Sequence, residues 1–164
     1  MTLTTHAIVG ALAAQFFPQY PAAAFAAGFA SHFVIDALPH WDYSLRSSRE
    51  HADPLQFDLE IGRDFVHDIV KIGFDAILGL FLSCVIAYLF DLSLILAVIG
   101  ACAGIFPDAL QFVYFKTHLK LLRSLQRFHI WIQEGRQLHI AAWKGISLQG
   151  ALVIVLICVV KAVL

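Results

Sequence analysis

The chain has 164 residues, of which 60% are hydrophobic and only 14% are charged, and its net charge is −1. A soluble domain carries about 45–50% apolar and about 25% charged residues, so this composition indicates a membrane protein. The near-neutral charge argues against a nucleic-acid partner, which binds a basic surface. The length suits one transmembrane domain over residues 1–164.

Apolar stretches follow one another along most of the chain. The first, residues 3–17, is short and is closed by Pro18 and Pro21. Four others approach or exceed the roughly 20 residues that cross a bilayer, namely 21–38, 65–90, 92–115 and 146–164. The sequence therefore predicts an all-α integral membrane protein with about five transmembrane helices, the first one short.

Two polar segments separate these stretches. Residues 39–64 contain the loop-like stretch SSREHADP, and residues 116–134 form a predicted basic helix. In that helix Lys116, Lys120, Arg123 and Arg127 recur at helical spacing, with leucines and Phe128 on the other side. Such a pattern is typical of an amphipathic helix lying on a membrane surface. We expect its four basic residues to contact the anionic head group of a lipid substrate.

The distribution of Lys and Arg predicts the orientation of the chain. The two polar segments, with the residues that follow to position 145, hold nine of the eleven basic residues. The positive-inside rule places both segments in the cytoplasm. The chain is then a multi-pass protein of the inner (plasma) membrane, with a cytoplasmic N-terminus.

Acids and histidines enter the apolar stretches from this cytoplasmic side only. His32 and Asp36 are four residues apart and share one helical face. An intramembrane acid is unfavourable by roughly 2.5–3.5 kcal/mol, so several in one leaflet need neutralisation. One or two divalent metal ions would supply it, and the mixed ligands favour Zn²⁺, with Mn²⁺ or Fe²⁺ as alternatives. The predicted ligands are His6, His32, Asp36, His67, Asp68, Asp75 and Asp108.

Two further carboxylates lie at the mouth of this predicted site. We expect Asp42 or Asp64 to act as general base, although Asp64 is equally suited to capping its helix. His118, His129 and His139 are assigned to the surface helix. Pro107 is expected to kink its helix and to free a backbone carbonyl beside Asp108.

Three short motifs, THAIVGALAA, GFASHFVIDALPHWD and AGIFPDAL, resemble a known family. They are similar to the membrane-bound metal-dependent hydrolases of bacterial inner membranes, the YdjM-type proteins. His6 matches the Thr-His element that opens the first helix of this family. Asp36, Pro39, His40 and Asp42 match its second element, and Pro107 with Asp108 matches its Pro-Asp element. The family's further Gly-x-Thr-His-Ser-type element is absent. The resemblance implies a hydrolase.

Together these features predict a membrane-embedded metal-dependent hydrolase that acts on a lipid-like phosphoester or ester at the cytoplasmic interface. Two alternatives use the same residues differently: a transporter of metal ions or protons, and a non-catalytic membrane adaptor that binds a partner through its basic helix.

A weak internal repeat is also present, since two helices rich in small residues end in Asp-Ala-Leu, at Asp36 and Asp108. A twofold arrangement would place these aspartates opposite each other.

Overall fold

The computed structural model describes residues 1–49 and 51–164, and the described chain is almost entirely helical. The long elements are α1 (Leu3–Ala14), α2 (Pro21–Asp36), α3 (Arg63–Leu89), α4 (Leu94–Thr117), α5 (Arg123–Gln133) and α6 (Ala142–Val163). Two short 3₁₀ helices, η1 (Pro54–Gln56) and η2 (Lys120–Leu122), and a small antiparallel hairpin of β1 (Ser48–Arg49) and β2 (Asp58–Leu59) complete it. The prediction of an all-α protein is confirmed.

Three of the helices, α3, α4 and α6, are long and apolar enough to cross a membrane. Their outward side chains are largely apolar and exposed, such as Val70, Phe74 and Ile77 on α3 and Ile154 and Val155 on α6. Apolar patches of this extent are rare on soluble monomers and suit contact with lipid.

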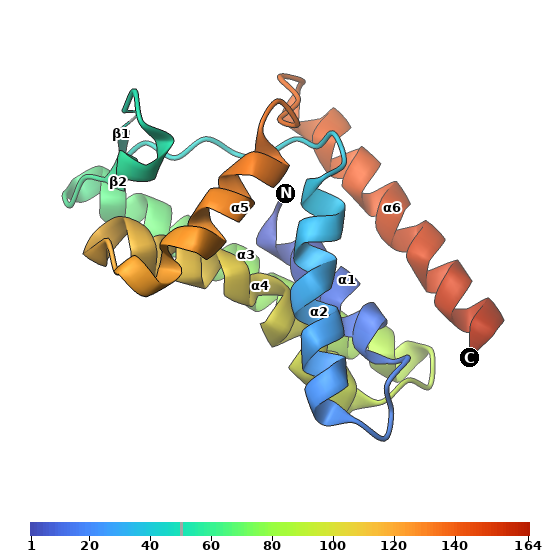
Figure 1. The fold of residues 1–164 in the computed structure, drawn as a ribbon. Helices are drawn as coiled ribbons and strands as arrows, with labels where there is room; N and C mark the ends of the chain where they lie inside the picture. Colours follow the sequence, from blue (N-terminus) through green and yellow to red (C-terminus); the bar gives the residue numbers. More distant parts are fainter. Residues whose placement is uncertain (50) are drawn as a thin grey trace.

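The short helix α1 lies at the centre of the molecule, behind α2 in Figure 1. It packs against α2, α3, α4 and α6, and nine of its twelve residues are buried. A helix that is apolar on all sides is one that neighbours surround. The first predicted helix is therefore a core helix covered by the longer ones.

Glycines allow these helices to approach closely. Gly100 and Gly104 lie one turn apart on α4, and the backbone of Gly10 on α1 rests directly against both. A Cβ atom on Gly28 of α2 would lie 2.7 Å from the Gly100 carbonyl oxygen, so no side chain fits there. This small-residue packing is common between transmembrane helices. Here it brings α1, α2 and α4 together beside the histidines of α1 and α2.

The two ends of the bundle differ in chemistry. At one end the α1–α2 and α3–α4 turns meet, since Gln15 Nε2 donates to the Ser93 carbonyl at 3.1 Å. The end of α6 lies there too, because Lys161 Nζ donates to the Phe90 carbonyl at 3.0 Å. At the other end lie the N-terminus, the connection from α2 to α3, and α5 (Figure 1). The predicted His and Asp residues are concentrated at this second end.

The predicted basic helix over residues 116–134 is divided in the structure. Helix α4 continues to Thr117, where His118 adopts a left-handed conformation with φ of 48° and ends it. The chain then turns through η2 before α5 begins at Arg123. A left-handed residue cannot continue an α-helix. The division matters because it folds α5 back over the end of α2.

Candidate metal centre

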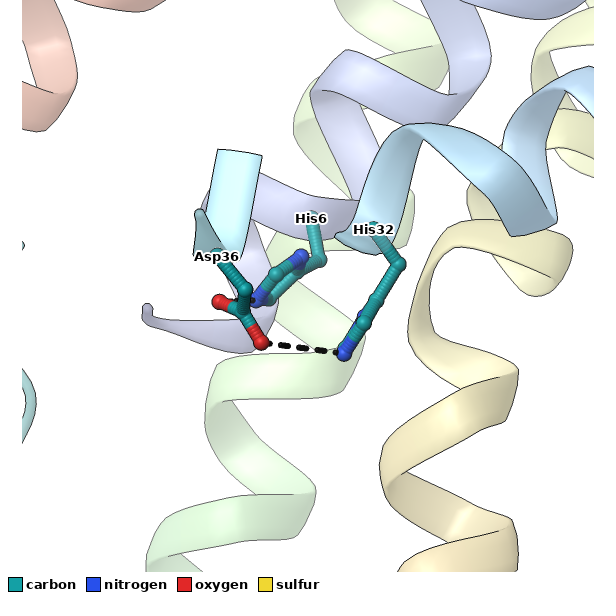
Figure 2. Close-up of side chains that lie close together, drawn as sticks. All are labelled: His6, His32 and Asp36. Carbon is teal, nitrogen blue, oxygen red and sulfur yellow. Dashed lines mark ion pairs between the residues drawn. The ribbon is translucent and has the colours of Figure 1, made fainter. Parts of the chain in front are cut away.

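Five buried or half-buried side chains from four helices meet at the end of the bundle that carries the N-terminus. They are His6 of α1, His32 and Asp36 of α2, Asp108 of α4 and His129 of α5. Asp108 is 26% exposed, whereas the other four are at most 1% exposed. Figure 2 shows the His6 and His32 rings stacked, with centroids 3.9 Å apart, beside the Asp36 carboxylate. We call these five residues the His/Asp cluster.

The distances within the cluster are short and similar. His32 Nε2 lies 3.1 Å from His129 Nε2, and these two nitrogens lie 3.3 and 3.4 Å from Asp36 Oδ2. Both also lie 3.7 Å from Asp108 Oδ1. His6 Nε2 approaches the other Asp36 oxygen, Oδ1, at 3.2 Å. The two Asp-Ala-Leu aspartates therefore converge on the same pair of histidines.

A hydrogen bond to the backbone fixes the tautomer of His32, and so determines which ring nitrogen presents a lone pair to the cluster. His32 Nδ1 donates to the Gly104 carbonyl at 2.8 Å, so in the neutral ring Nε2 carries no hydrogen. That lone pair points toward another imidazole nitrogen and two carboxylates. The accepting carbonyl lies three residues before Pro107, in the region where the sequence predicts an available carbonyl. Hydrogen-bonding of the outer ring nitrogen to a carbonyl is the usual way in which a metal-ligating histidine is oriented.

Several buried nitrogens of the cluster have no hydrogen-bond partner among the described residues. They are both ring nitrogens of His6 and Nδ1 of His129. A buried polar atom without a partner is unfavourable by about 1–3 kcal/mol. The facing lone pairs and carboxylates form groups that could hold a metal ion.

The spacing of these side chains is compatible with a bound metal ion. Ligands about 2.1 Å from a tetrahedral zinc ion lie about 3.4 Å from one another. The five distances that join His32, His129, Asp36 and Asp108 range from 3.1 to 3.7 Å. A mixed set of imidazole and carboxylate ligands also suits zinc, manganese or iron. His6, His32 and Asp36 form a second, adjoining group of possible ligands.

Further polar groups surround these ligands. Gln133 Nε2, one turn after His129 on α5, donates to Asp36 Oδ2 at 2.7 Å and lies 3.1 Å from His129 Nε2. The Met1 amino group lies 3.2 Å from Asp36 Oδ1. His40 Nε2 lies 3.9 Å from the same oxygen, and its Nδ1 donates to the Leu38 carbonyl. These contacts hold Asp36 in place.

The structure places the predicted ligands on α3 elsewhere. Asp75 accepts hydrogen bonds from the backbone of Leu3 and Thr4 at 2.7 and 3.1 Å, and it thereby caps the start of α1. Asp68 is buried and accepts the Ser47 N–H and hydroxyl at 2.8 and 2.7 Å. His67 is about half exposed beside Asp68. Asp68 and Asp75, which we call the polar stripe on α3, thus anchor neighbouring segments of the chain.

The two predicted general bases occupy different surroundings. Asp64 is exposed in the first turn of α3, whose N-cap is Gly62. Asp42 lies in the connection after α2, and with Asp108 it lines a cavity of about 500 Å³ between α3 and α4. Burial, reinforced by the charges of Asp108 and Asp36, raises the pKa of Asp42 to about 6 against the opposing effect of the Met1 amino group. Asp42 is therefore the carboxylate that adjoins the cluster.

The four predicted head-group residues lie outside the cluster. Lys116 donates to Asp58 Oδ1 at 2.7 Å and to the Leu59 carbonyl, so it holds the β1–β2 hairpin against α4. Lys120, Arg123 and Arg127 are exposed on η2 and α5. Their contact with a lipid head group stays a prediction.

Sequence reasoning missed His129 and Gln133. The sequence assigns His129 to the surface helix and does not single out Gln133, but the face of α5 that carries both turns inward and covers Asp36. The available signal was their spacing of four residues. Gln126 lies three residues before His129, so the three form a polar stripe on a helix whose other residues include Phe128 and Trp131.

Comparisons with protein-family models, curated proteins and solved structures give no match for this chain.

Proposed function

We propose that this chain is an integral membrane hydrolase that uses a divalent metal ion, most simply zinc, to cleave a lipid-like ester or phosphoester at the cytoplasmic interface. The observation that carries the proposal is the meeting of two adjoining groups of possible ligands that share His32, namely His6, His32 and Asp36, and His32, Asp108 and His129, of which only Asp108 reaches the adjoining cavity. A structural site is closed on all sides, whereas a catalytic site keeps an open position.

The placement in the membrane follows from the two ends of the bundle. Helices α3, α4 and α6 cross the bilayer, and α1 and α2 lie among them as two shorter helices, which makes five in total. The end with the cluster faces the cytoplasm, in agreement with the positive-inside rule. There η2 and α5 lie at the interface, because Leu121 of η2 and Trp131 of α5 are 90% and 68% exposed beside the basic residues.

Each polar residue has a role in this scheme. His32, His129, Asp36 and Asp108 would hold the ion, with His6 beside them. When bound, the ion supplies Lewis-acid chemistry and lowers the pKa of water toward 7. Asp42, with its side chain 33% exposed on the cavity, accepts the proton of the attacking water. The water oxygen bonds to the carbonyl carbon or phosphorus, the bond to the alcohol oxygen breaks, and that proton passes to the leaving alcohol.

The resemblance to the YdjM-type hydrolases supports this choice of chemistry. Three of the residues that carry it, His6, Asp36 and Asp108, belong to the cluster. A conduit for ions would need polar stations on both sides of the membrane. At the far end of the bundle the polar contacts are those of Gln15, Ser93 and Lys161 with backbone atoms.

Metal analysis of matched histidine variants tests the proposal. Protein purified in detergent without added metal is analysed for bound elements as wild type, His129→Ala and His139→Ala, and is assayed on long-chain p-nitrophenyl esters and phosphates. We expect metal and hydrolysis in the wild type and in His139→Ala, whose histidine is exposed in a loop, and neither in His129→Ala. Metal without hydrolysis, together with ion flux in proteoliposomes, would replace the hydrolase with a transporter.

A further inference from the structure

The cavity beside the His/Asp cluster has two chemically different parts. Asp42, Asp108 and Gln133 line it where it meets the cluster, and Gln133 also donates to Asp36. Most of the remaining wall is apolar and comes from α3, α4 and the segment between Tyr43 and Leu59. A ligand that fills the cavity is therefore polar at one end and hydrocarbon along the rest.

The cavity is far larger than a packing defect. Its volume of about 500 Å³ falls in the range of small-molecule binding sites. A methylene group takes up about the volume of a water molecule, about 30 Å³, so roughly 16 such groups fill it. That is room for one hydrocarbon chain of about this length.

The roof of the cavity is attached to the helices at several points. Tyr43, Leu45, Phe57 and Leu59 belong to this roof. Neighbouring residues tie it down: Ser47 to Asp68 at 2.7 Å, Lys71 to the Ser44 carbonyl at 3.0 Å, and Lys116 to Asp58 at 2.7 Å. The space is therefore enclosed by anchored structure on the cytoplasmic side.

We assign the entrance of the cavity to its apolar side between α3 and α4. Ile69 on α3 and Val113 on α4 both line the cavity, and each is also 38% exposed. Next to them the outer surface of α3 carries exposed Val66 and Val70. A hydrocarbon chain would pass this entrance from the lipid without contact with water, whereas a hydrophilic molecule would lose its hydration.

From these observations we propose that the cavity between α3 and α4 binds a single acyl or alkyl chain of a membrane amphiphile, which enters laterally and presents its head group to Asp42, Asp108 and Gln133. The inference rests on the proposed function, since it names the substrate class of the same site. The substrate is a single-chain amphiphile, and the residues that line α3 and α4 set its chain length.

Binding of alkylphosphonates tests this inference without turnover. Each methylene group that enters an apolar cavity strengthens binding about fourfold. In nanodiscs, displacement of a fluorescent fatty acid is measured for a series from hexyl- to hexadecylphosphonate. Ile72→Trp narrows the cavity, and Phe74→Trp alters the lipid-facing side of the same helix. Ala76→Phe is a second filling substitution in case Ile72→Trp does not fold.

We expect affinity to rise with chain length and then level off in the wild type and in Phe74→Trp. In Ile72→Trp and Ala76→Phe it should level off several carbons earlier. Because partition into the nanodisc lipid also rises with chain length, affinity is expressed relative to the free aqueous phosphonate, and this correction is the same for all variants. Identical chain-length profiles in the filled variants, with bound metal at the wild-type level, would overturn the inference. Loss of the proposed function appears separately, as absent metal or absent hydrolysis in the wild type.

Discussion

The His/Asp cluster and the polar stripe on α3 contain the same residue types, but they are built in opposite ways. On α3, Asp75 and Asp68 each receive hydrogen bonds from backbone N–H groups and hydroxyls. In the cluster, Asp36 and Asp108 face imidazole nitrogens, and the His6 nitrogens have no hydrogen-bond donor or acceptor in the described chain. An acid inside a helical bundle is therefore best classified by the atoms that face it, and spacing alone does not distinguish a ligand from an anchor.

Asp36→Asn should have the largest effect. The substitution preserves shape but removes the charge that the three surrounding histidines share. Loss of residues in the outer shell of a metal site commonly weakens affinity 10–100-fold, so loss of a central ligand should exceed about 100-fold. Metal content and hydrolysis should fall together, as measured by elemental analysis and ester cleavage. An Asp36→Asn protein with full metal occupancy would remove the distinction between the two regions.

Gln133→Leu should have the next effect, because Gln133 orients Asp36 and contacts His129 without being a ligand. We expect metal affinity to fall by about 10–100-fold while the fold persists. Competition with a calibrated chelator measures this, and Gln56→Leu at an exposed position serves as the control. Unchanged affinity would show that Asp36 needs no support from α5.

Asp75→Asn should affect stability and leave the metal in place. The amide keeps one acceptor, but its NH₂ group faces the N–H groups at the start of α1. An unsatisfied buried donor is unfavourable by about 1–3 kcal/mol, so the melting temperature in detergent should fall. Loss of metal at unchanged stability would assign Asp75 to the centre after all.

Lys116→Met should have the smallest effect. An exposed ion pair contributes about 0.2–1 kcal/mol, and Asp58 is largely exposed. The hydrogen bond from Lys116 lowers the pKa of Asp58, so the pair stabilises the fold above the ordinary aspartate pKa. This contribution is lost as the pH falls through the lowered value. The stability difference between wild type and variant should therefore shrink in acid to the part contributed by the hydrogen bond from Lys116 to the Leu59 carbonyl, as thermal unfolding across pH would measure.

Part of the centre could be predicted from the sequence because burial of charge is costly wherever it occurs. His32, Asp36 and Asp108 stand out for that reason, since each interrupts an apolar stretch. His6 stands out in the same way on the shortest stretch. The apolar stretches 65–90, 92–115 and 146–164 predict three long helices, and α3, α4 and α6 agree with them. The count of five transmembrane helices stays a prediction.

The rest depended on tertiary contacts. Whether the polar face of α5 meets water or Asp36 is decided by the left-handed turn at His118, and a histidine at that position carries no strong turn signal. In the same way, Asp75 is spaced as a ligand, but its donors come from Leu3 and Thr4, more than seventy residues away. A local sequence pattern shows which residues share one face of a helix, but it does not show which element packs against that face.

The central position of α1 has a consequence for how the protein is made. Its twelve residues extend only about 18 Å, which is well short of the roughly 30 Å hydrocarbon core. A helix of this length gains little from partitioning alone, so we expect its membrane insertion to await the helices that enclose it. His129 and Gln133 emerge from the ribosome still later, on α5. A metal ion held by His129 would therefore bind only after translation of α5.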